Sequence, residues 1–196
     1  MPKLKTIKVQ GIVTIRQGDK ILCKKAVNHF VDAGLKSLLS CIIWSAITDN
    51  YQSGTSPVYW YLPAYSGWSI YCGNDTTTPT TTGTTTLTDP IGTPPGTAPN
   101  VLGCSVHSGA SDGDWFVILT GTWNVGSLPA ETLGEVALYM RASTETTFAW
   151  TKTDVNYTPS VVMISRLSNA DGDFASFTID DTKPLTVDWK IQFQFA

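Results

Sequence analysis

The chain has 196 residues, enough for one all-β domain of ordinary size with a sizeable core. Only 15% of the residues are charged, against roughly 25% in typical soluble domains, and the formal net charge is −3. This balance excludes the basic footprint of a protein that binds nucleic acid or anionic lipid. We therefore expect a single β-sandwich domain over residues 1–196, with no nucleic-acid partner and no membrane partner.

The N-terminal segment "MPKLKTIKVQGIVTIRQGDKIL" alternates polar and apolar residues and lacks the unbroken apolar stretch of a signal peptide. No apolar run approaches the roughly 18 residues that a membrane span needs. We expect synthesis in a cytoplasm. The cysteines lack CxxC spacing, which favours buried thiols and leaves a disulfide as the alternative. They are Cys23, Cys41, Cys72 and Cys104.

The first elements predicted along the chain are a β-hairpin and a short helix. Residues 6–16 alternate around Gly11, and "KILCKKAV" follows across Gln17-Gly18-Asp19, which is typical of a hairpin. Apolar residues then recur at helical spacing: Val31, Leu35, Leu38, Leu39 and Ile42. This stripe predicts one short helix, which completes an N-terminal unit over residues 6–47.

Residues 75–99 hold twelve threonines and five prolines. Apart from the prolines, only Leu87, Ile91 and Ala98 are apolar, so the segment has little with which to bury a core, and proline removes ladder donors. We predict an extended arm whose order comes from contact with a neighbouring subunit. The residues expected in that contact are Thr76, Pro79, Leu87, Pro90, Ile91, Pro94 and Pro95.

Most of the remaining segments have sequence patterns that predict β-strands. They are "PVYWYL" and "GWSIYCG" before the arm, then "DWFVILTGTWNV", "GEVALYMRAS", "TFAWTKTDV", "SVVMISRLS", "FASFTI" and "PLTVDWKIQFQF". The last has the strictest pattern, because every second residue from Leu185 to Phe195 is apolar. The expected fold class is all-β: an antiparallel β-sandwich or jelly-roll-like barrel with one short helix and a long Thr/Pro-rich arm.

Two Asp-Gly-Asp clusters could bind calcium or form turns. Asp112 and Asp114 in "ASDGDWFVILT" and Asp171 and Asp173 in "NADGDFASFTI" offer oxygen ligands. Neither loop has EF-hand spacing or a distant glutamate to complete a site. Asp-Gly is favoured where a tight turn needs positive φ, so we predict two hairpin corners and keep calcium as the alternative.

No residues are arranged for catalysis in a recognisable way. Ser105 lies two residues before His107 without the GxSxG elbow, and Cys104 and His107 form a C-x-x-H without a second ligand pair. Glu131 and Glu135 are close in sequence, but nothing places them across a cleft. We predict that the protein is not an enzyme, has no catalytic residue and needs no cofactor.

The segment of residues 44–68 is unusually aromatic, and exposed aromatic side chains suit both protein interfaces and sugars. The candidates are Trp60, Tyr61, Tyr65 and Trp68. A carbohydrate-binding β-sandwich module, with a glycan as its partner, is therefore the alternative function.

Several stretches, taken in their order along the chain, resemble segments of structural proteins of tailed-phage virions. They are "GIVTIRQGDKILCKKAVNHFVDAGLKSLL", "SIYCGNDTTTPTTTGTTTL", "GEVALYMRA" and "ISRLSNADGDFASFTIDDTKPLTVDWKIQFQF". This resemblance implies a non-enzymatic virion component, either a head decoration protein or a tail or fibre part. Its partners would be its own copies and other virion proteins, and threefold axes of such particles favour a homotrimer or a repeating lattice.

Overall fold

The computed structural model describes residues 7–27, 30–31, 68–92, 96–99, 101–108, 114–143 and 159–195. Within these ranges the regular elements are β-strands, which confirms the all-β class, and none of them forms a helix that could span a membrane. The short helix expected before residue 47 lies outside the described residues except for Val31. The strands expected at "PVYWYL" and "TFAWTKTDV" lie outside them as well.

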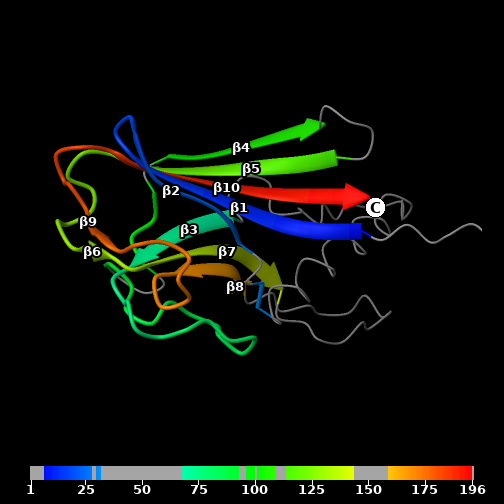
Figure 1. Cartoon of the computed structure of the whole chain (residues 1–196), viewed down its shortest axis with the longest axis horizontal. Helices are drawn as coiled ribbons and strands as arrows, with labels where there is room; N and C mark the ends of the chain where they lie inside the picture. Colours follow the sequence, from blue (N-terminus) through cyan, green and yellow to red (C-terminus); the bar gives the residue numbers. More distant parts are fainter. Residues whose placement is uncertain are drawn as a thin grey trace, which may run out of the picture.

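The larger sheet has five antiparallel strands in the order β2-β1-β10-β5-β4 (Figure 1). Its strands are β1 (Ile7–Gln17), β2 (Lys20–Val27), β4 (Val101–Ser108), β5 (Asp114–Trp123) and β10 (Leu185–Phe195). The predicted hairpin is confirmed, because β1 and β2 pair antiparallel around a turn in which Gly18 has a φ of 55°. The long C-terminal strand lies at the centre of this sheet, between β1 and β5.

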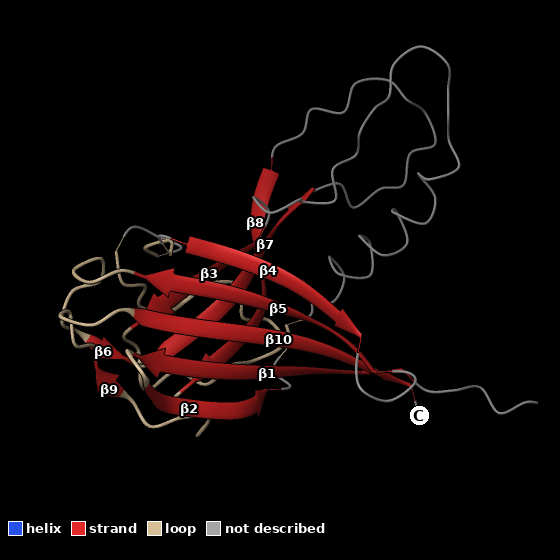
Figure 2. Ribbon diagram, turned by 90° about the horizontal axis from the view of Figure 1, so that it is seen from above, coloured by secondary structure: helices blue, strands red, loops and turns tan. Residues whose placement is uncertain are grey.

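The smaller sheet has three antiparallel strands in the order β3-β7-β8. They are β3 (Trp68–Gly73), β7 (Glu135–Ser143) and β8 (Pro159–Ser168), and a two-residue pair, β6 (Thr132–Leu133) and β9 (Phe177–Thr178), lies at one end. Seen from above, the strands of the smaller sheet cross behind those of the larger one (Figure 2). The two sheets form the predicted antiparallel sandwich.

The main core fills the space between the sheets. Residues alternate between buried and partly exposed along β10, as its period of two predicts: Leu185, Val187, Trp189 and Ile191 are all at most 2% exposed. The smaller sheet contributes the other half of this core through Ile70, Cys72, Val136, Leu138, Met140, Ile164 and Leu167. Burial of these apolar side chains is the main stabilising term of the sandwich.

Three details of the strand predictions differ from the structure. The strands β4 and β6 are not among the predicted ones, and "FASFTI" contributes only the two residues Phe177–Thr178 to a strand. Residues before β9 instead form the turn that follows β8. Local composition is a weak guide for such short or marginal strands because their pairing depends on neighbours that are distant in sequence.

Candidate functional site

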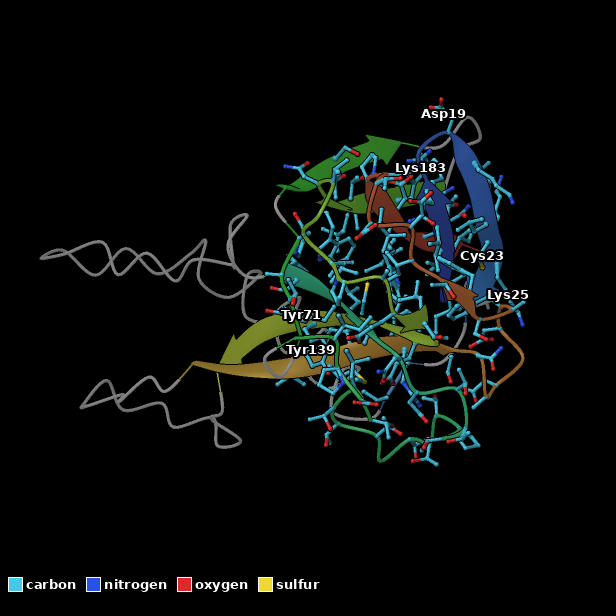
Figure 3. All side chains as sticks on the ribbon, turned by 90° about the vertical axis from the view of Figure 1, so that its left-hand side faces the viewer. Asp19, Cys23, Lys25, Tyr71, Tyr139 and Lys183 are labelled. Carbon is cyan, nitrogen blue, oxygen red and sulfur yellow. The ribbon has the colours of Figure 1, made fainter. Side chains whose placement is uncertain are left out.

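The outer face of the smaller sheet is covered by residues 75–92, which we call the threonine loop (Figure 1). A second apolar cluster lies beneath it, formed by Val31, Leu87, Ala137, Tyr139 and Met163, with Tyr71 packed against it. Leu87 is 4% exposed, and its backbone N–H donates a hydrogen bond of 2.9 Å to the Tyr139 hydroxyl. Tyr71 and Tyr139 meet edge to face, with ring centroids 5.3 Å apart (Figure 3).

A buried ion pair lies between this sheet and the loop. Arg166 Nε and Nη2 approach Glu135 Oε2 to 2.8 Å and 2.7 Å, and neither side chain is exposed to solvent. The two residues are diagonal neighbours on one face of the antiparallel pair β7–β8, since Arg166 is opposite Ala137. Gly73 on β3 leaves room for the carboxylate, because a Cβ there would lie 2.3 Å from Glu135 Oε1.

The loop backbone supplies the remaining partners of this ion pair. Glu135 accepts hydrogen bonds from the backbone N–H groups of Thr88, at 3.2 Å, and Asp89, at 2.9 Å. Arg166 Nη1 donates to the Thr78 carbonyl at 2.9 Å, and Arg166 Nη2 lies 3.3 Å from Asp75 Oδ2. A buried ion pair is tolerated only when such additional bonds satisfy its charges. We call the set of Arg166, Glu135 and Asp75 the clamp.

Further contacts fix the two ends of the loop. Asp75 accepts hydrogen bonds from the backbone N–H groups of Thr77 and Thr78, at 3.1 Å and 3.0 Å. Asp171 accepts one from the Thr80 N–H at 3.0 Å. At the other end, Ile91 is 2% exposed and donates its N–H to the Cys72 carbonyl at 2.9 Å. The loop is therefore held by its own domain at several separate points.

This arrangement corrects the expectation that the order of the Thr/Pro-rich segment comes from outside the chain. Leu87 and Ile91, two of the residues expected to contact another subunit, are buried within the domain. The expectation was wrong because polar anchors on β7 and β8 replace the apolar side chains that the segment lacks. Subunit contact through Thr76, Pro79 and Pro90 stays a prediction, while Pro94 and Pro95 lie outside the described residues.

The outward side of the loop is rich in hydroxyl groups. Its exposed threonines, which we call the threonine surface, are Thr77, Thr78, Thr81, Thr82, Thr85, Thr86 and Thr88. Asp89 is the exposed charged residue of this loop, since Asp75 is partly buried. The structure thus presents a fixed, nearly uncharged surface on the side of the smaller sheet that faces away from the core.

The Asp-Gly-Asp cluster at residues 171–173 lies in a turn with positive φ, as predicted, since Gly172 has a φ of 69°. The turn is not the expected hairpin corner, because it joins β8 to β9 and these strands belong to different sheets. Asp171 binds the threonine loop, while Asp173 accepts the Ser168 N–H at 3.1 Å and lies 3.2 Å from Lys25 Nζ. In the described part of the chain, no three His, Cys, Asp or Glu side chains are grouped to hold a metal ion. Asp112 lies outside that part, and the side chain of Asp114 in β5 is not described.

The other candidate residues are not brought together. Glu135 is part of the clamp, whereas Glu131 is exposed. Ser105 is exposed on β4, and the side chains of its neighbours Cys104 and His107 are outside the described set. Trp68 is partly buried and packs against the main core, and a glycan or subunit contact through it stays a prediction. The other aromatic candidates, Trp60, Tyr61 and Tyr65, lie outside the described residues.

The prediction of buried thiols is confirmed for Cys23 and Cys72, which are buried and free. Burial raises the pKa of the Cys72 thiol strongly, and the nearby Glu135 carboxylate adds to this. Burial also raises the pKa of Cys23, with a further contribution from Asp173. Neither thiol has the lowered pKa of a reactive cysteine. Cys41 lies outside the described residues.

Comparison with known proteins gives a viral relative. The chain is 34% identical over 91 residues to the uncharacterized protein ORF274 of Acidianus filamentous virus 1 (isolate United States/Yellowstone). The match covers 44% of this chain and 30% of the relative. Neither a protein-family model nor a solved structure matches. The similarity supports a viral protein, but its archaeal virus source does not support the narrower assignment to tailed phages.

The clamp predicts a specific sensitivity to acid. Partial burial of Asp75 opposes its ionisation, but hydrogen bonds from Thr77 and Thr78 outweigh burial and lower its pKa from 3.8 to about 2. A lowered folded-state pKa stabilises the fold above the unfolded value, and this contribution is lost as the pH falls from about 4 to about 2. Urea unfolding should show Asp75→Asn to be less stable than wild type at pH 6, with the difference shrinking as the pH falls below about 4 and vanishing only below about pH 2. A difference that stays constant over this range would contradict the assignment.

Proposed function

We propose that this chain is a non-enzymatic structural subunit of a virus particle, which acts by assembling with its own copies and with other particle proteins. The observation that carries the proposal is the threonine surface, a nearly uncharged surface fixed in place by a buried ion pair. The similarity to a protein of a virus supports a viral origin for the chain.

A fixed surface suits assembly for two physical reasons. Ordering side chains and loops on association costs free energy, and a loop that the clamp has already ordered avoids much of that cost. Charged groups are costly to bury in an interface unless they are paired, whereas threonines bring a methyl group and a single hydroxyl. The threonine surface can therefore be covered by a neighbour at a small desolvation cost.

The position in the particle and the stoichiometry are finer parts of the proposal. The resemblance to virion proteins implies a head-decoration or tail position, and closed rotational symmetry favours a trimer or a repeating lattice. We infer self-association as the property that these alternatives share. The first test therefore measures assembly and does not depend on the position.

Adding a charge to the threonine surface should weaken assembly without unfolding the domain. Thr82→Lys and Thr85→Lys each place an ammonium group on an exposed position of the loop. We expect the dissociation constant of the oligomer, measured by sedimentation velocity, to rise by about tenfold or more, because like charges from neighbouring copies are brought together or desolvated. Melting temperatures should stay close to that of wild type.

Thr178→Lys is the matched control, because Thr178 is an exposed threonine on β9, away from the loop. It should leave assembly unchanged. The proposal is wrong if the wild-type protein stays monomeric and is absent from purified virus particles. An equal effect of all three substitutions would show that the threonine surface is not the contact.

A further inference from the structure

The two sheets have four edges, and each free edge strand is a template on which another strand can pair. Three of the four are at least partly protected. The edge of β3 is covered at its Gly73 end by the threonine loop, where Gly73 bridges to Pro90 and the Asn74 N–H donates to the Asp89 carbonyl at 2.8 Å. The edge of β8 is covered at its middle by Phe30, which bridges to Ser165, and by Val31, whose N–H donates to the Ile164 carbonyl at 3.2 Å.

The β2 edge of the larger sheet is protected by charge. It carries Lys20, Lys24 and Lys25, and its register with β1 shifts at a bulge between Ile15 and Arg16. Lysines and bulges are devices that prevent an edge strand from pairing with another chain. A second copy that lay antiparallel along β2 would bring these lysines against lysines of its own kind.

Among the described residues, none covers the fourth edge, β4, and its sequence has neither the lysines nor the bulge of β2. Its eight residues, "VLGCSVHS", include no Lys, Arg, Asp, Glu or Pro, and its register with β5 runs from Val101 to Ser108 without a shift. Among the described residues β4 pairs only with β5, and it forms the border of the larger sheet (Figure 2). A long, regular and uncharged edge of this kind favours pairing with another strand.

We propose that β4 is a subunit interface at which the β4 strand of a second copy pairs antiparallel across a twofold axis, joining two five-stranded sheets into one. This deepens the assembly function proposed above and rests on it. A second copy is the occupant that the charge pattern favours. An uncharged strand meets no like charge when it pairs with itself, and a twofold contact is self-complementary.

The register with β5 limits how the two strands can meet. Gly103 and Ser105 are opposite Thr120 and Ile118, so all four lie on the outer face of the larger sheet. Directly opposite residues in a continuous sheet share a face. Position 105 of one copy therefore pairs with a position on the same face of the other, and registers centred near it place the two copies of residue 105 directly opposite each other or one diagonal step apart.

Charge substitution at Ser105 tests the interface. Ser105 is exposed, so Ser105→Lys and Ser105→Glu should both fold. Each alone places like charges near the twofold axis, and we expect the dissociation constant of the dimer to rise by about fivefold or more. An equimolar mixture of the two variants should recover dimers, detected as the mixed species by native mass spectrometry. Recovery on mixing cannot result from misfolding of either variant.

The matched control is Thr14→Lys, which adds the same charge to the same outer face on β1, away from the β4 edge. It should leave the dimer unchanged. The β4 interface is wrong if the Ser105 variants dimerise like wild type, if mixing recovers nothing, or if Thr14→Lys is equally disruptive. If the Ser105 variants assemble like wild type but Thr82→Lys does not assemble, the proposed function stands and only the β4 contact fails. A wild-type protein that is monomeric at every concentration overturns the contact as well.

Discussion

Arg166→Met should destabilise the protein by about 3–5 kcal/mol, because it leaves the Glu135 carboxylate buried without its counter-ion. The guanidinium also bonds the Thr78 carbonyl and lies beside Asp75, so its loss releases one half of the threonine loop from the sheet. Urea unfolding at neutral pH measures the change in the free energy of unfolding. Limited proteolysis, followed by mass spectrometry, measures release of the loop.

The double variant Arg166→Met/Glu135→Leu separates the two effects. Replacing a buried ion pair by apolar residues of similar volume is often close to neutral, so the double variant should recover much of the stability that the single variant loses. The loop backbone would still lack its partners at Thr78 and Asp89. We therefore expect a stable domain with a loop that proteases cut faster than in wild type. A single variant as stable as wild type would show that the clamp does not hold the loop.

The clamp also shows which parts of the structure the sequence could predict. Glu135 and Arg166 lie in "GEVALYMRAS" and "SVVMISRLS", both correctly predicted as strands. Their burial could not be predicted, because it depends on a loop distant in sequence that covers the outer face of the smaller sheet. Charged residues are seldom fully buried, so a lone Arg or Glu in a strand is normally assigned to solvent.

The composition of residues 75–99 leads to a wrong prediction for the same reason, because the order of this segment depends on contacts with residues distant in sequence. The segment has few apolar residues, and disorder or an external partner is the usual consequence of that composition. Here two buried apolar side chains, Leu87 and Ile91, act together with hydrogen bonds from the loop backbone to the clamp. Backbone hydrogen bonds leave no trace in the composition, so no signal in the segment itself could have revealed them.

The β4 edge illustrates a different limit. "VLGCSVHS" has neither strict alternation nor a continuous apolar run, so its strand was missed even though it forms ladder contacts along its whole length. The absence of charge in this segment became informative only when the topology placed it at a sheet border. The same residues in a central strand would carry no such meaning.

The two proposed contacts lie on different parts of the molecule. The threonine surface is on the outer side of the smaller sheet, whereas β4 is at the border of the larger sheet (Figures 1 and 2). A twofold contact alone closes into a dimer, but two independent contacts on one subunit can extend an assembly. Many weak contacts then act together, so neither interface has to be strong in isolation.

The second large effect is expected at the centre of the larger sheet. Trp189 is fully buried and lies on β10 between Val13 of β1 and Leu119 of β5. Trp189→Ala should destabilise the domain by about 3–5 kcal/mol, because it removes a large apolar side chain and leaves a cavity between the two sheets. The free energy of unfolding in urea measures this loss.

Two further substitutions test whether the destabilisation by Trp189→Ala comes from lost packing in the core. Lys190→Ala changes the next residue, whose ammonium group lies 4.0 Å from the centre of the Phe116 ring on the outer face, and should cost no more than about 1 kcal/mol. Trp189→Phe should cost less than Trp189→Ala because it keeps an aromatic ring in the core. It also removes a buried indole N–H that has no hydrogen-bond partner among the described residues, so no bond is lost. If Trp189→Ala and Lys190→Ala had equal effects, the alternation along β10 would not mark the core of this sandwich.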